Sequence, residues 1–343
     1  MGIQTHFIKF HNTIKLSKTD DAYSSARDKD DSISKAVKEA FKDEGYEVID
    51  DFIQGSFSTD TAILSIDGDF DIDRGIVIDD EDAPSNPVDP KKVTLDVLEK
   101  RGFTNAKIKK PCVTANYKSQ NLHIDFPIYK KSGDTYYLAI GKKDSEEKSR
   151  EWAAADPKGL KSWVKSKSAY IGSQDDKLQQ FNRLVRYIKR WRDHKFSGDV
   201  CRKVYSIGLT VMIKHSFVPS FDKDGKPCDL TALKNTVQSI INGSYFYNQG
   251  NDQYKVVVSL PVTPYRDIFD GSSIDTGTQL RNKLKKLLEK LEDALDEEDE
   301  VEKCKTLNWV FGDDFKIPEK KTESNKVKVV YPTAGAAGTS HGA

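Results

Sequence analysis

One short run near position 70 limits the possible folds of this chain more than any other part of the sequence. In residues 69–73, Asp-Phe-Asp-Ile-Asp, acidic and apolar residues alternate. Successive side chains of a β-strand point to opposite faces, so Asp69, Asp71 and Asp73 share one face and the apolar residues the other. The apolar continuation at 76–78, Ile-Val-Ile, is typical of a central strand. The sequence therefore predicts a buried strand that carries three carboxylates on one face.

Carboxylates crowded on one strand face repel each other unless a cation lies between them. Mg²⁺ takes oxygen ligands, commonly one or two carboxylates together with phosphate oxygens. We therefore predict a magnesium site at Asp71 and Asp73. The pair Asp69 and Asp71 also fits an Asp-x-Asp pattern, but we prefer the later pair because Arg74-Gly75 then continues the strand.

Two further features accompany the acidic strand. Asp125 is the lone acid in the apolar run 122–127, Leu-His-Ile-Asp-Phe-Pro. A buried charge needs a partner, which is either the same metal site or a salt bridge to a nearby Lys or Arg. Gly55-Ser56 precedes the acidic strand, and a bare glycine lets a phosphate approach backbone amides. Together these features indicate a site for a phosphorylated ligand.

Gly-Ser, then Asp-x-Asp, then one more strand acid resembles the pattern of the polymerase-β-like nucleotidyltransferase superfamily. Within it, the chain resembles the bacterial cGAS/DncV-like nucleotidyltransferases (CD-NTases) of CBASS antiphage systems. The segments that carry the resemblance extend over nearly the whole chain before the tail: 55–56, 61–63, 70–73, 123–127, 152–160 and 309–315.

The resemblance implies an enzyme that makes cyclic di- or trinucleotide second messengers from ATP and other nucleoside triphosphates in antiviral defence. It implies that Asp71, Asp73 and Asp125 are catalytic and bind two Mg²⁺ ions, with Mn²⁺ as a substitute. Relatives often have an aromatic residue where this chain has Ile207, which puts base stacking there in doubt. The residues implied in nucleotide binding are Gln54, Gly55, Ser56, Arg186, Lys189 and Ser206.

The segment 178–191 agrees with such a ligand. Its apolar residues form one stripe of a predicted helix, and Arg and Lys fill the rest with almost no acid to balance them. A solvated charged face is the usual meaning of such a helix. However, a triphosphate needs cations beyond the metal ions, and this helix can supply them.

The predicted fold class is α+β. A polymerase-β-like lobe, a mixed sheet with flanking helices, precedes a mainly helical lobe, with the active site in the cleft between them. Apolar periods predict strands at 46–53, 70–78, 114–116, 122–129 and 136–140. They predict helices ending near 44 and at 91–100, 177–194, 206–215, 230–241 and 278–295. The expected division is a catalytic lobe with an N-terminal helix at 1–141, a connector at 142–170, a helical lobe at 171–317 and a flexible tail at 318–343.

The charge balance limits the partners. The chain has 54 basic residues (Lys and Arg) and 54 acidic residues (Asp and Glu), so its formal net charge is zero. Proteins that bind long nucleic acid usually carry a surplus of basic residues. We therefore expect small phosphorylated ligands and no requirement for long nucleic acid. No stretch is apolar enough to span a bilayer, and the start lacks the apolar region of a signal peptide, so we expect a bacterial cytoplasmic protein without a membrane partner.

Three functions remain open. The first is the cyclic nucleotide synthase, and the second is a linear nucleotidyltransferase acting on RNA, a protein or a small molecule. The third is a nucleotide-binding regulator without catalysis, which the three acids argue against. The bases, ring size, 2′ or 3′ linkage, activation and oligomeric state stay open.

The resemblance also implies two kinds of partner. One is a downstream effector that senses the product. The other is an E1/E2-like ligase acting on the C-terminal end, where the small residues Gly342-Ala343 would fit a narrow adenylating site. The alternative for this end is an unselected disordered tail.

Overall fold

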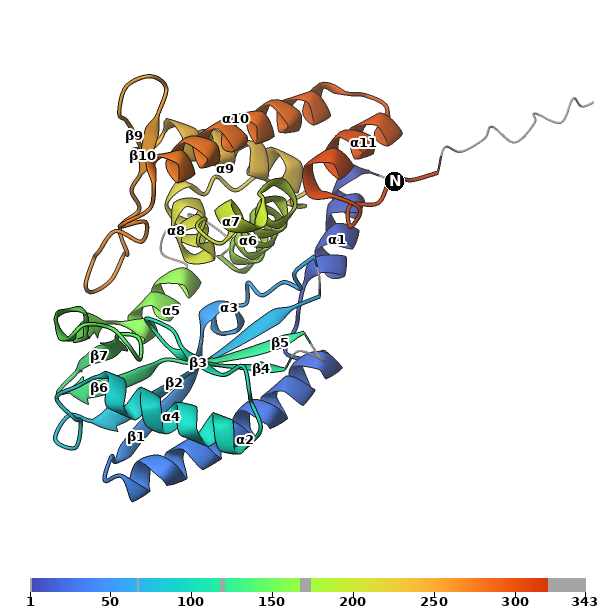
Figure 1. The fold of residues 1–343 in the computed structure, drawn as a ribbon. Helices are drawn as coiled ribbons and strands as arrows, with labels where there is room; N and C mark the ends of the chain where they lie inside the picture. Colours follow the sequence, from blue (N-terminus) through green and yellow to red (C-terminus); the bar gives the residue numbers. More distant parts are fainter. Residues whose placement is uncertain (1, 67, 118–120, 167–173, 320–343) are drawn as a thin grey trace, which may run out of the picture.

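The computed structural model describes residues 2–66, 68–117, 121–166 and 174–319. Figure 1 shows two lobes, one built around a β-sheet and the other built mainly of helices. This is the predicted arrangement of a mixed sheet with flanking helices followed by a helical lobe.

The sheet lobe is organised around β2, the predicted acidic strand. The strand order is β3-β4-β5-β2-β6-β7-β8, and β1 also pairs with β2. β2 runs parallel to β5 and β6 and antiparallel to β1. The strands are β1 (Val48–Gln54), β2 (Phe70–Asp79), β3 (Lys107–Ile108), β4 (Val113–Tyr117), β5 (Leu122–Phe126), β6 (Ile128–Ser132), β7 (Thr135–Ile140) and β8 (Glu151–Ala155). The single strand predicted at 122–129 is interrupted at Pro127, which has no N–H for a ladder bond.

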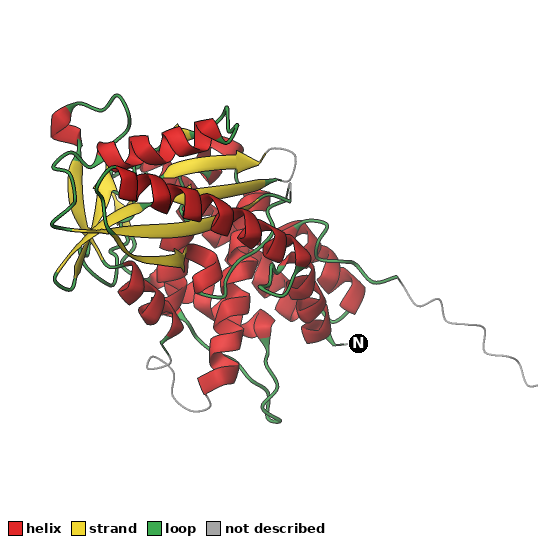
Figure 2. Cartoon of the chain, turned by 90° about the horizontal axis from the view of Figure 1, so that it is seen from below, coloured by secondary structure: helices red, strands yellow, loops and turns green. Residues whose placement is uncertain are grey.

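Two long helices cover the apolar face of this sheet, α2 (Asp21–Asp43) and α4 (Val88–Lys100) (Figure 2). Ile72, Ile76 and Ile78 of β2 are fully buried in one core with Val37 and Phe41 of α2. The alternation in the sequence therefore separates the two faces as predicted: the apolar side chains pack against the helices, and the acids lie on the opposite face.

Arg74 fixes α2 to the sheet. Its Nε atom lies 3.2 and 3.1 Å from the carboxylate oxygens of Asp30, and its Nη2 atom lies 2.7 Å from Asp30 Oδ2. The same guanidinium also donates to Asp31 and Asp51. Asp30 is fully buried and Arg74 nearly so. Removal of one partner would therefore leave a charge in the interior.

We expect Asp30→Ala to lower the free energy of unfolding by about 3 kcal/mol, because it removes the main partner of a buried guanidinium. Asp28→Ala, at an exposed position of the same helix, is the matched control and should change stability by less than about 0.5 kcal/mol. Urea unfolding followed by circular dichroism measures both. Equal losses in the two variants would contradict a structural role for the Arg74 network.

The helical lobe has its own core around α6, in which Trp191 and Tyr187 are buried. The predicted helices at 91–100, 177–194, 206–215, 230–241 and 278–295 all form. The remaining elements are α1 (Ile3–Ile14), α3 (Gly55–Ser58), α5 (Pro157–Lys165), α6 (Gln174–Lys195), α7 (Gly198–Cys201), α8 (Ser206–Ser216), α9 (Asp229–Asn242), β9 (Phe246–Asn248), β10 (Tyr254–Val256), α10 (Ile274–Asp296) and α11 (Glu300–Phe311).

The N-terminal segment differs from the prediction. It forms two helices rather than one, and α1 packs in the core of the helical lobe. The ring of Phe10 stacks on Tyr187 of α6 with centroids 5.2 Å apart, and Phe7 lies 5.2 Å from Phe315. These long-range aromatic contacts have no signature in local periodicity. The helix predicted to end near residue 44 corresponds to α2 on the sheet lobe, whereas α1, which the prediction included in the lobe 1–141, packs in the helical core.

Two other expectations can be compared with the structure. The segment predicted as a connector contributes β8, which pairs antiparallel with β7 at the edge of the sheet. The leucines of α10 at positions 280, 284, 287 and 291 are buried in the helical lobe, so this stripe packs on its own lobe. The predicted tail lies almost entirely outside the described residues.

Candidate active site

The sheet register brings the predicted acids into one row. Asp73 is paired with Gln54 of β1 on one side and with Asp125 of β5 on the other. Residues paired across a ladder point to the same face, so Asp73 and Asp125 share a face with Asp71, two positions earlier in β2. Asp69 precedes the first residue of β2, which favours the register Asp71 and Asp73 over the earlier pair.

The electrostatics of these acids is unfavourable in the absence of a cation. Burial raises the pKa of Asp73 to about 7, and the neighbouring charges of Asp125 and Asp71 act in the same direction. Burial also raises the pKa of Asp71, although water reaches its side chain in the cleft, and Asp125 again adds to the shift. Neighbouring carboxylates raise each other's pKa because their negative charges repel. A bound divalent cation stabilises the ionised form of such a group.

Asp125 has other partners in this structure. Thr114 Oγ1 donates a hydrogen bond of 2.5 Å to Asp125, and Lys109 Nζ lies 3.3 and 3.4 Å from its two carboxylate oxygens. The salt bridge that was the alternative for Asp125 is therefore present. Within the described ranges, no three His, Cys, Asp or Glu side chains are already gathered in a group that could hold a metal ion.

The donor set nevertheless fits divalent cations. Asp71, Asp73 and Asp125 supply oxygen ligands on one face of neighbouring strands, and the repulsion among them is what a cation would relieve. The Lys109 ammonium now neutralises Asp125 and would have to turn away when a metal ion binds.

Gly55 lies against Asp73 because it directly follows β1, the strand that pairs with β2. It begins the short helix α3 directly after β1 and has a φ angle of +64°, in the left-handed region. A Cβ atom at this position would lie 2.0 Å from Asp73 Oδ2, so any other residue would have to displace this carboxylate or the turn. Gly55 and the side chain of Asp73 are therefore in direct contact.

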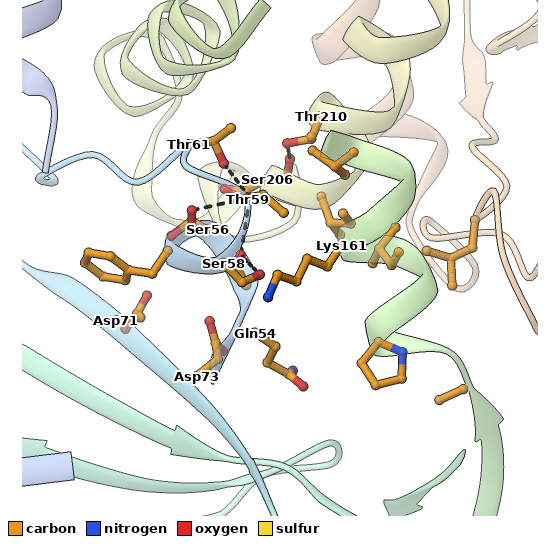
Figure 3. Close-up of a pocket in the computed structure, with 18 of the residues that line it drawn as sticks. Gln54, Ser56, Ser58, Thr59, Thr61, Asp71, Asp73, Lys161, Ser206 and Thr210 are labelled. Atoms are coloured by element: carbon orange, nitrogen blue, oxygen red, sulfur yellow. Dashed lines mark hydrogen bonds between the residues drawn. The ribbon is translucent and has the colours of Figure 1, made fainter. Parts of the chain in front are cut away.

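A cavity of about 550 Å³ lies between the lobes at this point (Figure 3). The sheet lobe contributes the Gly-Ser turn and acids of β2, and the helical lobe contributes cations and hydroxyls. Lining residues from the first group are Gln54, Gly55, Ser56, Asp71 and Asp73 with Tyr129, and from the second Lys189, Arg192, Ser206 and Thr210. The predicted position of the site, in the cleft between the lobes, agrees with this cavity.

Lys189 and Ser206 reach the cavity from α6 and α8. Lys189 Nζ donates to Thr61 O at 2.9 Å, and burial together with the charges of Arg192 and Arg186 lowers its pKa to about 7. Ser206, the first residue of α8, accepts a hydrogen bond of 2.6 Å from Arg192 Nη1. A triphosphate in this cavity would restore the charge of the lysine.

We expect Lys189→Ala to raise the KM for nucleoside triphosphate about tenfold or more, since a charge-assisted bond to phosphate contributes about 1.5–3 kcal/mol. Because the pKa of Lys189 is about 7 in the empty protein, triphosphate binding at pH 8 should take up about one proton. Calorimetry in two buffers of different ionisation enthalpy measures this uptake, which Lys189→Ala should abolish.

Arg190→Ala is the control for Lys189. Arg190 is buried, donates to Leu64 O at 2.8 Å and lies 3.1 Å from the carboxylate of Asp314. Its replacement should lower stability and leave proton uptake unchanged. An equal rise in KM in both variants would mean that the cationic face acts diffusely.

Arg186 requires a correction. It was predicted to bind nucleotide, but it does not line this cavity. Its guanidinium donates to the backbone carbonyls of Asp60 and Ala62, at 2.5 and 3.1 Å, on the far side of the segment that follows α3. Arg186 and Lys189 are three positions apart on α6, close to one helical turn, but only Lys189 lines this cavity.

Three basic residues of the cavity were not predicted. Arg192 lies in the basic helix but was not singled out, and its contact with Ser206 depends on how α6 meets α8. Lys161 projects from α5 into the space near Gln54 and Asp73, as Figure 3 shows. Arg266 reaches the cavity from the loop after β10. Neither Lys161 nor Arg266 belongs to a motif that spacing alone identifies.

Comparisons with known proteins agree with this geometry. Residues 50–129, which contain the Gly-Ser turn and all three acids, match the family described as cyclic GMP-AMP synthase DncV-like, nucleotidyltransferase domain. Over these residues the chain is similar to a DncV-like nucleotidyltransferase domain. A cyclic GMP-AMP synthase of Escherichia albertii is 29% identical over 171 residues, which are 47% of this chain and 36% of that protein. The match therefore spans about a third of the length of this relative.

Solved structures extend the likeness in fold to both lobes. The Bradyrhizobium diazoefficiens CD-NTase CdnG, in complex with GTP, has a TM-score of 0.68 at 14% identity and covers 92% of this chain and 97% of its own. CdnC of Escherichia coli MS115-1, with ATP, has a TM-score of 0.62 at 14% identity and covers 91% of this chain and 98% of its own. The predicted fold and the predicted relation to bacterial CD-NTases are confirmed.

A search of the described helices finds none with the length and apolar character that a membrane span requires.

Proposed function

We propose that this DncV-like nucleotidyltransferase joins nucleoside triphosphates, ATP among them, into a cyclic di- or trinucleotide and releases pyrophosphate. The observation that carries the proposal is the cavity of about 550 Å³ between the lobes, in which the Gly55 turn meets Asp73 and where Lys189 and Ser206 enter from the other side. Similar proteins support the choice of chemistry: one is a cyclic GMP-AMP synthase, and others are in complex with GTP or ATP.

Some of these residues bind the phosphates of the donor nucleotide, and others activate the attacking hydroxyl. Asp71, Asp73 and Asp125 would hold two Mg²⁺ ions, or Mn²⁺ in their place, which would supply positive charge to the phosphates and acidify the hydroxyl when bound. Ser56 and the α3 amides donate hydrogen bonds to phosphate oxygens. Lys189, recharged by the phosphates, neutralises the charge that develops on the leaving pyrophosphate.

Proton transfer and water exclusion complete the mechanism. Asp125, next to Asp73 in the sheet, would help to accept the proton of the attacking ribose hydroxyl. The apolar wall formed by residues 153–155, together with Leu160 and Val164, excludes water from the linear intermediate. A second transfer on that intermediate closes the ring.

The biological setting belongs to the same proposal. We place the enzyme in the bacterial cytoplasm, in an antiviral system where a downstream effector senses the product. CdnC, one of the similar structures, has also been solved in a complex with HORMA. An E1/E2-like ligase acting on the C-terminal residues Gly342-Ala343 remains a hypothesis, because these residues lie outside the described part of the chain.

Incubation with all four labelled nucleoside triphosphates and Mg²⁺ or Mn²⁺ tests the function. We expect a product that survives phosphatase, because a ring has no terminal phosphate, and mass spectrometry of that product identifies its bases and ring size. The Asp71→Asn, Asp73→Asn double variant is the control for contaminating activities. Complete digestion of every product by phosphatase would indicate the linear nucleotidyltransferase instead.

A further inference from the structure

A second cavity, of about 380 Å³, lies behind the active-site segment. It shares only Phe57 and Ala62 with the first cavity, so residues 55–62 form the wall between the two. We call it the back cavity. Its other walls come from the end of α1, from the segment between α1 and α2 and from α6. The residues used below are His11, Lys15, Lys18, Asp60, Asn182 and Arg186.

The back cavity has a surplus of positive charge. Arg186 is only 6% exposed and makes no ion pair with any described residue, since its guanidinium bonds to backbone carbonyls. Half-buried Lys15 likewise makes no ion pair within the described ranges. The carboxylate of Asp60 lies 3.5 Å from Lys18 and 2.8 Å from Lys165, so it is already shared by two cations. A buried guanidinium without a counter-ion is expensive unless an anion binds near it.

Two buried polar atoms of the same cavity lack hydrogen-bond partners among the described residues. They are His11 Nδ1 and Asn182 Oδ1. Burial and nearby Arg186 lower the pKa of His11 to about 3, so its imidazole is neutral at physiological pH and can donate or accept. Each buried polar group without a partner costs about 1–3 kcal/mol, so a ligand that forms hydrogen bonds with both atoms would remove this cost.

We infer that the back cavity binds a small phosphate-bearing molecule and that its occupancy is coupled to nucleotide binding in the first cavity. Phosphate oxygens would accept from Arg186, Lys15 and His11, and a hydroxyl of the ligand or a protonated phosphate would donate to Asn182. The charge surplus matches the one to two negative charges of a phosphate group near neutral pH.

The coupling has a direct physical route. Arg186 donates hydrogen bonds to the carbonyl oxygens of Asp60 and Ala62. Lys189 donates to the carbonyl oxygen of Thr61, which lies between them, at 2.9 Å. An anion that draws Arg186 toward the back cavity weakens its hold on this segment, which continues from the Gly55 turn. The segment then has two arrangements with different affinities for nucleotide, which is what coupling between two sites requires.

The test uses the full chain and inorganic phosphate, with KCl added to keep the ionic strength equal. We expect phosphate at ten times its Kd to raise the Tm by about 2 °C. Lys15→Gln with Lys18→Gln should weaken phosphate binding, measured by calorimetry, at least tenfold. Lys161→Gln, which removes a cation from the first cavity instead, is the matched control and should retain the binding.

The outcomes are separable from those of the proposed function, because binding needs no turnover. No Tm shift, unchanged affinity in the Lys15→Gln, Lys18→Gln variant, or loss of binding in Lys161→Gln would overturn the back-cavity site. Coupling is measured as the Kd of a non-hydrolysable triphosphate with and without phosphate. We expect a change of threefold or more in the wild type and none in the double variant; the same change in both would overturn the coupling.

Discussion

Replacing Asp71 and Asp73 together by Asn should reduce product formation about 10³-fold or more, while the fold stays intact. Neutral amides bind Mg²⁺ poorly, and the stabilisation that metal ions give to a phosphoryl transition state amounts to several kcal/mol, of which each 1.36 kcal/mol is a factor of ten in rate. Product formation by mass spectrometry measures the loss.

The same variant should be as stable as the wild type, or more stable, in metal-free buffer at pH 8. The pKa of Asp73 is about 7 in the folded protein, above its usual value of 3.8, so the folded state holds more protons than the unfolded state between these values. Stability of the wild type therefore falls as the pH rises from about 4 through 7, and Asn removes this dependence. After discounting for solvent screening we expect a gain of about 1 kcal/mol at pH 8.

Addition of Mn²⁺ should raise the Tm of the wild type and leave that of the double variant unchanged. The single variant Asp69→Asn is the control for register, because Asp69 precedes β2 and should not be a ligand. Near-normal turnover in the double variant would refute the proposed metal site. A loss in Asp69→Asn as large as in Asp73→Asn would shift the metal pair to the earlier acids.

Gly55→Ala should lower kcat/KM about 100-fold in a protein that still folds. The added Cβ would lie 2.0 Å from Asp73 Oδ2 and 2.9 Å from its Cγ, so the carboxylate or the turn must move. A displacement of about 1 Å at a reacting centre is enough for a loss of this size. The positive φ of +64° adds about 1 kcal/mol of backbone strain for alanine.

Gly133→Ala separates these two effects. Gly133 has a similar φ of +57°, but a Cβ there meets no atom within 4 Å. Both variants should lose similar stability to backbone strain, measured by urea unfolding, while only Gly55→Ala should lose activity. Equal activity in the two variants would show that the contact between the Gly-Ser turn and Asp73 is not needed for turnover.

The sequence by itself determined the elements whose pattern is local. Alternation at 69–73 was sufficient to place Asp71 and Asp73 on one face of a central strand, because the side-chain period of a strand is two in any context. The leucine repeat after residue 278 likewise predicted α10, and the Gly-Ser turn was recognisable because Asp-x-Asp and a further strand acid follow it in the sequence.

Only the tertiary structure decided which residues meet across the two lobes. In the structure, α1 packs in the helical core through Phe7 and Phe10. Lys161 and Arg192 line the first cavity. The tertiary structure also separated Arg186 from Lys189 into different cavities, although both lie on one basic helix. The physical reason is that these contacts depend on how whole elements pack, and packing joins residues more than a hundred positions apart that no local period connects.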